Sequence, residues 1–149
     1  MPRWPLLILI TLLGGCSHMT TQTKWLQAGH GLLMAADSSQ TIQGQNAPDC
    51  YREAGWPTRD IIGEHPSESA IVGFQALRFV LHSSVSNWLD KKVSNDDDEG
   101  WRWIRAGWHV LSFAYEIDVV RRNHNEGLRV FSPHAVPQRC IDARNALKP

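Results

Sequence analysis

Three segments of this chain repeat apolar residues at intervals of three and four, and each is long enough for several helical turns. The first covers about residues 24–43, the second runs from Pro66 or Ser67 to about residue 89, and the third covers about 101–123. Gly, Pro and acidic residues separate them. The pattern predicts an all-α fold, a small antiparallel bundle of three main helices with an irregular C-terminal tail.

The apolar residues of these segments predict which helix faces form the core. An amphipathic helix usually turns its apolar stripe inward and its polar face to water. We also expect most of the tryptophans in the core, although Trp101, Trp103 and Trp108 at a lipid or partner surface is an alternative. The residues expected in the core are Trp25, Gly29, Leu32, Leu33 and Ala36 in the first helix, and Phe74, Leu77, Leu81, Val85 and Trp88 in the second.

Polar residues form narrow stripes on the same segments, bordered by apolar residues on both sides. Such residues are expected to be partly buried, and buried polar groups need partners, so we expect the three stripes to meet. Among them, Arg78 is expected to pair with Glu116, with Asp37 or with both. The stripes are Asp37 and Gln40 in the first helix, Gln75, Arg78 and His82 in the second, and Arg105, His109, Ser112, Glu116 and Asn123 in the third.

The N-terminus has the layout of an export signal. A positive start at Arg3 is followed by an apolar run over residues 6–13, which is too short for a permanent membrane span. The run ends in Leu13-Gly14-Gly15-Cys16, which resembles the bacterial lipobox, so Cys16 is expected to be cut free and acylated. The sequence is therefore divided into a signal peptide (1–15), a lipidated tether (16–23), a helical domain (24–131) and a C-terminal tail (132–149).

The lipobox implies an anchor in the bacterial cell envelope. Two or more acyl chains hold a protein stably to a bilayer, whereas one does not. Ser17 follows the cysteine, where an Asp would favour the inner membrane in that class of protein, so we expect an outer-membrane lipoprotein facing the periplasm. Polar residues interrupt the second and third helices, which argues against their spanning the membrane. In this oxidising compartment, Cys50 and Cys140 are predicted to form a disulfide, and two buried free thiols are the alternative.

Three motifs resemble an uncharacterised family of small bacterial and phage-encoded envelope proteins. They are Asp37-Ser38-Ser39-Gln40-Thr41, the loop Ile61-Ile62-Gly63-Glu64-His65-Pro66-Ser67, and Glu116 with Arg122-Asn123 and Gly127. The match covers about residues 30–131, but family members are more hydrophobic in the last two helices and lack the tail that holds Cys140. The resemblance implies a helical architecture and a phage or prophage context, and it implies no mechanism. For phage-borne members, it makes altered susceptibility to other phages an expected role.

No motif in the sequence specifies a reaction, a metal site or a cofactor. Equal numbers of basic and acidic residues, 15 each, argue against nucleic-acid binding. The acidic run 95–99 does not complete a calcium-binding loop, because Ala106 stands where the last ligand would be. Glu64-His65 fits a polar turn before a helix better than a base or ligand pair.

We therefore expect a non-enzymatic lipoprotein that acts by contact with a protein or the envelope. The alternative is a hydrolase or lipid-modifying enzyme that uses Asp37, His82, His109 and Glu116, with or without a metal.

Overall fold

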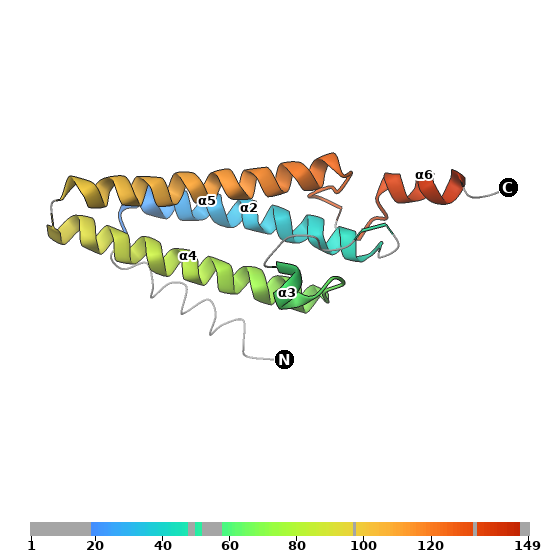
Figure 1. Cartoon of the computed structure of the whole chain (residues 1–149), viewed down its shortest axis with the longest axis horizontal. Coiled ribbons are helices and arrows are strands. Elements are labelled where there is room, and N and C mark those ends of the chain that lie inside the picture. Colours follow the sequence, from blue (N-terminus) through green and yellow to red (C-terminus); the bar gives the residue numbers. More distant parts are fainter. Residues whose placement is uncertain (1–18, 48–49, 52–57, 97, 133, 147–149) are drawn as a thin grey trace. The chain divides into compact units, whose positions relative to one another are not determined.

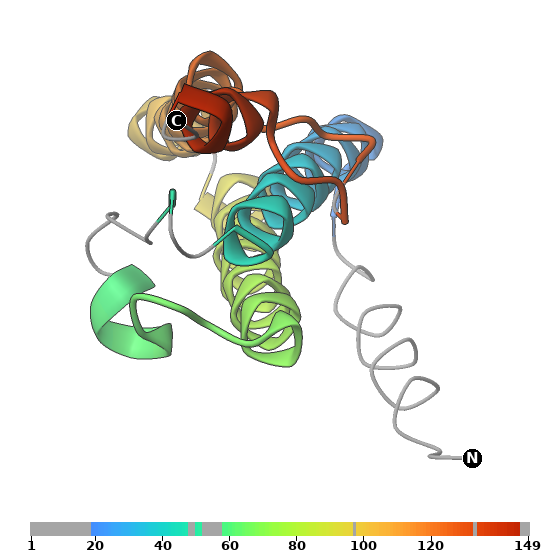
Figure 2. The same cartoon turned by 90° about the vertical axis from the view of Figure 1, so that its right-hand side faces the viewer.

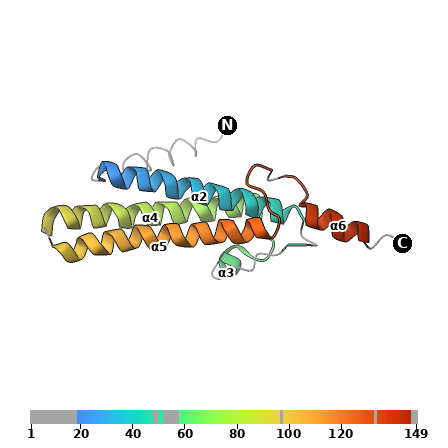
Figure 3. The same cartoon turned by 90° about the horizontal axis from the view of Figure 1, so that it is seen from above.

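The computed structural model describes residues 19–47, 50–51, 58–96, 98–132 and 134–146, so the predicted signal peptide (1–15) and Cys16 lie outside the described part. Figure 1 shows its elements, and Figures 2 and 3 show them from two further directions. The described elements are all helices, three of them long, which confirms the predicted all-α bundle. They are α2 (Thr21–Gln45), α3 (Thr58–Ile62), α4 (Glu68–Asp96), α5 (Glu99–Asn125) and α6 (Gln138–Ala146).

The chain divides into two compact units, and each takes a part of all three long helices. Unit 1 consists of Met1–Gly31 and Leu77–Ala114, and unit 2 consists of Leu32–Ala76 and Tyr115–Pro149. Each unit is described by itself below.

Contacts between the helices establish their antiparallel order. In unit 1, Gln27 of α2 bonds to Ser86 of α4, whereas Thr23, which comes earlier in α2, bonds to Asp90, which comes later in α4. Between α4 and α5, Ser86 bonds to Trp108, whereas Asp90, later in α4, bonds to the earlier Arg105. The partner moves backward along the chain in both pairs of helices, so both pairs are antiparallel.

Local capping groups set the helix ends. Ser67 accepts a hydrogen bond from Ala70 N at the start of α4, as the sequence predicts, and Asp98 accepts one from Gly100 N at the start of α5. At the end of α5, Gly127 has a φ of 91°, and Leu128 N donates to Asn123 O. Together with the bond from Gly127 N to His124 O, this is a Schellman cap, a motif that favours glycine because its backbone is left-handed there.

The predicted core faces are wrong for much of α2 and α4. Trp25 is 75% exposed and Leu32 73% exposed, and the predicted core residues Leu77, Leu81 and Trp88 are exposed as well. The other predicted core residues, Gly29, Leu33, Ala36, Phe74 and Val85, are half-buried. The helices instead turn their polar stripes inward, because those side chains find hydrogen-bond partners on neighbouring helices. The buried face of α2 includes Thr23, Gln27, His30, Met34, Asp37, Gln40 and Gln43, at intervals of three and four.

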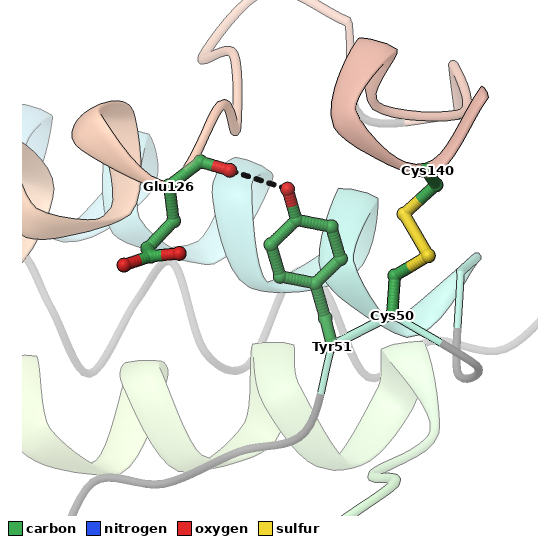
Figure 4. The surroundings of a disulfide bond; sticks show 4 residues. All are labelled: Cys50, Tyr51, Glu126 and Cys140. Atoms are coloured by element: carbon green, nitrogen blue, oxygen red, sulfur yellow. Dashed lines mark hydrogen bonds between the residues drawn. A yellow bond between two sulfur atoms is a disulfide. The ribbon is translucent and has the colours of Figure 1, made fainter. Parts of the chain in front are cut away.

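The C-terminal tail is fixed to unit 2 by a disulfide and contains one helix, α6. Cys50 and Cys140 are joined, with their Cα atoms 5.9 Å apart and a sequence separation of 90. Beside the bridge, the Tyr51 hydroxyl donates to the Glu126 carbonyl oxygen, as Figure 4 shows. Within the described residues, no helix combines the length and the hydropathy that a bilayer crossing requires.

Candidate functional site

A buried carboxylate, Asp90, joins the three helices of unit 1. Its side chain is fully buried, and its Oδ1 accepts hydrogen bonds from Arg105 Nη1 at 2.9 Å and from Thr23 Oγ1 at 3.0 Å. Its Oδ2 accepts from Thr20 N at 2.8 Å. Thr20 in turn caps α2, because its Oγ1 accepts from Thr23 N. Asp90 therefore fixes the start of α2 against α4 and α5.

A second polar network surrounds the buried amide of Gln27. Gln27 Nε2 donates to Ser86 Oγ at 2.6 Å, and Gln27 Oε1 accepts from Ser83 Oγ at 3.1 Å. The same amide oxygen lies 3.1 Å from His82 Nδ1. Since an amide oxygen only accepts, Nδ1 of His82 carries the proton. Ser86 Oγ also accepts from Trp108 Nε1 at 3.1 Å, so the network spans all three helices.

Three buried histidines pack together beside this network. His30 stacks on His82 with ring centroids 3.9 Å apart, and His109 meets the edge of His82 at 5.8 Å. The ring of Trp108 stacks on His82 at 5.0 Å. The histidines are 4–6% exposed. Within the described residues, four of their ring nitrogens have no hydrogen-bond partner, namely His30 Nδ1, His82 Nε2 and both nitrogens of His109.

Burial keeps these imidazoles neutral. Desolvation is the largest cause in each case and lowers the pKa of His30 to about 4 and that of His82 to about 3. Arg78 also lowers both pKa values through its positive charge. The pKa of His109 is lowered by desolvation and by Arg105, against an opposing effect of Asp90. Among the described residues, no group of three His, Cys, Asp or Glu side chains is placed so that it could hold a metal ion.

In unit 2, Asp37 joins the three long helices. Its Oδ2 accepts from Gln75 Nε2 at 2.5 Å, and its Oδ1 accepts from Asn123 Nδ2 at 3.0 Å. Asp37 is 7% exposed and Gln75 8% exposed. The predicted meeting of the three polar stripes therefore occurs here, with one residue from each helix. The pairing predicted for Arg78 stays a prediction.

Further polar residues of α2 hold the segment that follows α5. Gln40 is fully buried, and its Nε2 donates to the carbonyl oxygens of Val120 and Leu128 at 3.3 and 3.4 Å. One helical turn on, Gln43 Nε2 donates to Ala135 O at 3.1 Å, and Gln43 Oε1 accepts from Arg129 N. These amides replace the regular hydrogen bonds that an irregular segment lacks.

The structure buries most of the polar residues that the sequence singled out. Arg78 and Asn123 are half-buried, whereas Glu64 and His65 lie exposed in the loop before α4. Of the four residues in the enzymatic alternative, His82 and His109 come together in unit 1, while Asp37 and the 1%-exposed Glu116 belong to unit 2. The buried members are Asp37, Gln40, Gln75, His82, His109 and Glu116.

Sequence reasoning missed several residues of the polar interior, including Thr23, Gln27, His30, Ser86 and Asp90. A signal for those in α2 was present, since they continue the stripe of Asp37 and Gln40 backward at intervals of three, four and seven. No comparable signal marked Asp90, because it lies just past the last apolar residue of its segment.

Searches among protein-family models, curated proteins and solved structures found no match to this chain.

Proposed function

We propose that this chain is a bacterial envelope lipoprotein, anchored in the outer membrane through an acylated Cys16 and facing the periplasm, that acts by contact with a protein or with the envelope itself. The observation that carries the proposal is the Leu13-Gly14-Gly15-Cys16 sequence after a short apolar run with a positive start. The helical bundle begins soon afterwards, with α2 at Thr21, so the domain would lie close to its anchor.

The polar interior supports a role in contact more than one in catalysis. Both carboxylate oxygens of Asp37 accept hydrogen bonds from neutral amides, and His82 and His109 are 6% and 5% exposed. A catalytic base must reach the proton of a substrate, which buried side chains of this kind do not. Large exposed apolar side chains, among them Trp25 and Trp103, supply the surface that a contact requires.

Fractionation of a Gram-negative host that expresses the full chain tests the anchor. Wild-type protein should enter the outer-membrane fraction, and mass spectrometry of its N-terminal peptide should show an acylated Cys16. The Cys16→Ser variant should be soluble or keep its signal peptide. Recovery of that variant in membranes after high-salt and carbonate washing would show that another part of the chain is the anchor.

Substitution of Ser17, the residue after Cys16, tests the predicted sorting to the outer membrane. Ser17→Asp should move the acylated protein toward the inner membrane, whereas Ser17→Ala, as a matched control, should leave it in the outer membrane. Recovery of the acylated Ser17→Ala variant in the inner membrane would contradict the outer-membrane assignment while leaving the acylation intact.

A further inference from the structure

One side of α5 in unit 1 is apolar and exposed over three turns. We call it the α5 face and define it as Trp103, Ile104, Gly107, Val110, Leu111 and Ala114, which share one side of the helix and include no charged residue. Trp103 and Leu111 are each 71% exposed and Val110 is 66% exposed. Contiguous apolar surface of this kind is typical of a contact with another apolar phase.

The opposite side of α5 fixes this orientation. Arg105 bonds to buried Asp90, Trp108 donates to Ser86, and His109 packs on the edge of His82. Turning the helix to bury Val110 would break these contacts and leave the buried Asp90 without the charge of Arg105. The α5 face therefore points outward because its polar side is committed to the interior of unit 1.

The start of α2 lies beside the same part of α5. Thr20 N and Arg105 Nη1 donate to the two oxygens of Asp90, at 2.8 and 2.9 Å. Trp103 and Ile104 come directly before Arg105 in α5. Four residues lead from Cys16 to Thr20, and an extended chain of that length spans at most roughly 14 Å. An acylated Cys16 would thus hold this end of unit 1 close to the bilayer surface.

We propose that the α5 face lies on the phospholipid bilayer to which Cys16 is anchored, with Trp103 at the level of the headgroups. This inference rests on the proposed lipid anchor and adds a second, non-covalent membrane contact. An amphipathic helix that turns its apolar side to lipid and its polar side away binds in the plane of the interface. Tryptophan is enriched at that level because its ring is apolar and its indole N–H is polar.

Fluorescent labels on two exposed positions test the contact. Val110→Cys places a nitrobenzoxadiazole label on the α5 face, and Gln22→Cys places it on α2, nearer to Cys16 along the chain but off the face. Each full-length, processed protein is purified from membranes and reconstituted in phosphatidylethanolamine–phosphatidylglycerol vesicles, with or without acyl chains that carry doxyl quenchers. Mass spectrometry of the N-terminal peptide records whether Cys16 is acylated. Circular dichroism confirms the fold of both variants.

Contact with lipid predicts a blue-shifted Val110 label that doxyl chains quench more strongly than the Gln22 label. Equal quenching at both sites would show that the tether alone holds the domain near the bilayer, and this result would overturn the inference. A blue shift that doxyl chains do not quench and that fades on dilution of the protein in lipid would identify a second copy as the occupant, and would overturn it too. An unacylated protein with no quenching would reject both proposals, whereas an unacylated protein with a quenched Val110 label would reject only the anchor.

Discussion

At the scale of single residues, buried polar side chains join the helices beside a small apolar core that includes Met34, Ile71 and Leu89. Asp90 receives three hydrogen bonds from α2 and α5, and Gln27 receives or donates three with α4. A buried polar group that loses its partner costs more free energy than a lost surface contact. Substitution at these residues should therefore be more damaging than at the exposed tryptophans.

Replacing Asp90 should destabilise the protein strongly. Asp90→Asn leaves the half-buried Arg105 without its counter-charge, and removal of one partner from such a pair costs about 3 kcal/mol of unfolding free energy. Asp96→Asn is the matched control, because Asp96 forms an exposed pair with Lys92 at 3.5 Å and should cost roughly 0–1 kcal/mol. Urea unfolding of both variants measures the difference. Equal losses of unfolding free energy in the two variants would contradict the role of Asp90.

The three histidines predict that acid destabilises the fold. Folding lowers the pKa of His30 to about 4 and that of His82 to about 3, so below the usual value near 6.5 the unfolded chain binds more protons than the folded one. Stability should be constant above that value and fall as the pH drops toward 4. At pH 5 the loss should be on the order of 2 kcal/mol for His30 and the same for His82.

Unfolding free energies measured between pH 5 and pH 7.5 test this slope. His82→Gln should flatten the slope, whatever it does to the stability at pH 7.5, because one titrating group is gone. His65→Gln, at an exposed loop position, should leave the slope unchanged. If both variants kept the wild-type slope, the loss of stability in acid would not come from His82, which would contradict the prediction.

At the scale of elements, the local sequence pattern predicts each long helix, but particular capping residues set where the helix begins and ends. Ser67 caps α4 at the start that the sequence predicts, and Asp98 caps α5, which begins at Glu99, two residues before the predicted start. The start of α2, by contrast, comes three residues before the predicted Lys24, because the distant Asp90 binds Thr20 N. Helix α4 likewise continues to Asp96, past the end of its apolar pattern.

Two glycine-to-alanine substitutions should have opposite signs. Gly127→Ala forces an L residue into a left-handed backbone and should cost about 1–2 kcal/mol. Gly73→Ala adds a Cβ with nothing within 4 Å in the middle of α4 and should stabilise the helix by roughly 0.5–1 kcal/mol. Thermal unfolding measured side by side checks both. Stabilisation by Gly127→Ala would refute the assigned cap.

At the scale of the whole molecule, the disulfide ties the tail to unit 2 across most of the sequence. With a sequence separation of 90 between Cys50 and Cys140, the chain-entropy model gives a stabilisation of about 4 kcal/mol. Reduction of the wild type should lower the urea midpoint by a corresponding amount. The variant with both cysteines changed to Ala should match the reduced protein and should not respond to reductant. Peptide mapping of periplasmic material that finds both thiols free would contradict the bridge.

The sequence by itself determined the helical class, the number of long helices, the start of α4 near Ser67 and only a part of the polar residues that the interior holds. These features follow from the spacing of apolar residues, from the Gly and Pro residues that end helices and from capping hydrogen bonds, all of which act over a few residues. The sequence also predicted that Cys50 and Cys140 pair, because they are the two cysteines left once Cys16 is assigned to the lipid anchor.

Only the tertiary structure decided which face of each helix turns inward. The apolar face of α2, with Trp25 and Leu32, and the polar face, with Gln27 and Asp37, have the same period, so local pattern does not choose between them. The choice depends on whether polar groups on one helix meet partners on another, as Gln27 meets Ser86 and as Asp37 meets Gln75 and Asn123. Those pairs are about 40 to 90 residues apart in sequence, and a pairing energy over that separation exists only once the chain has folded.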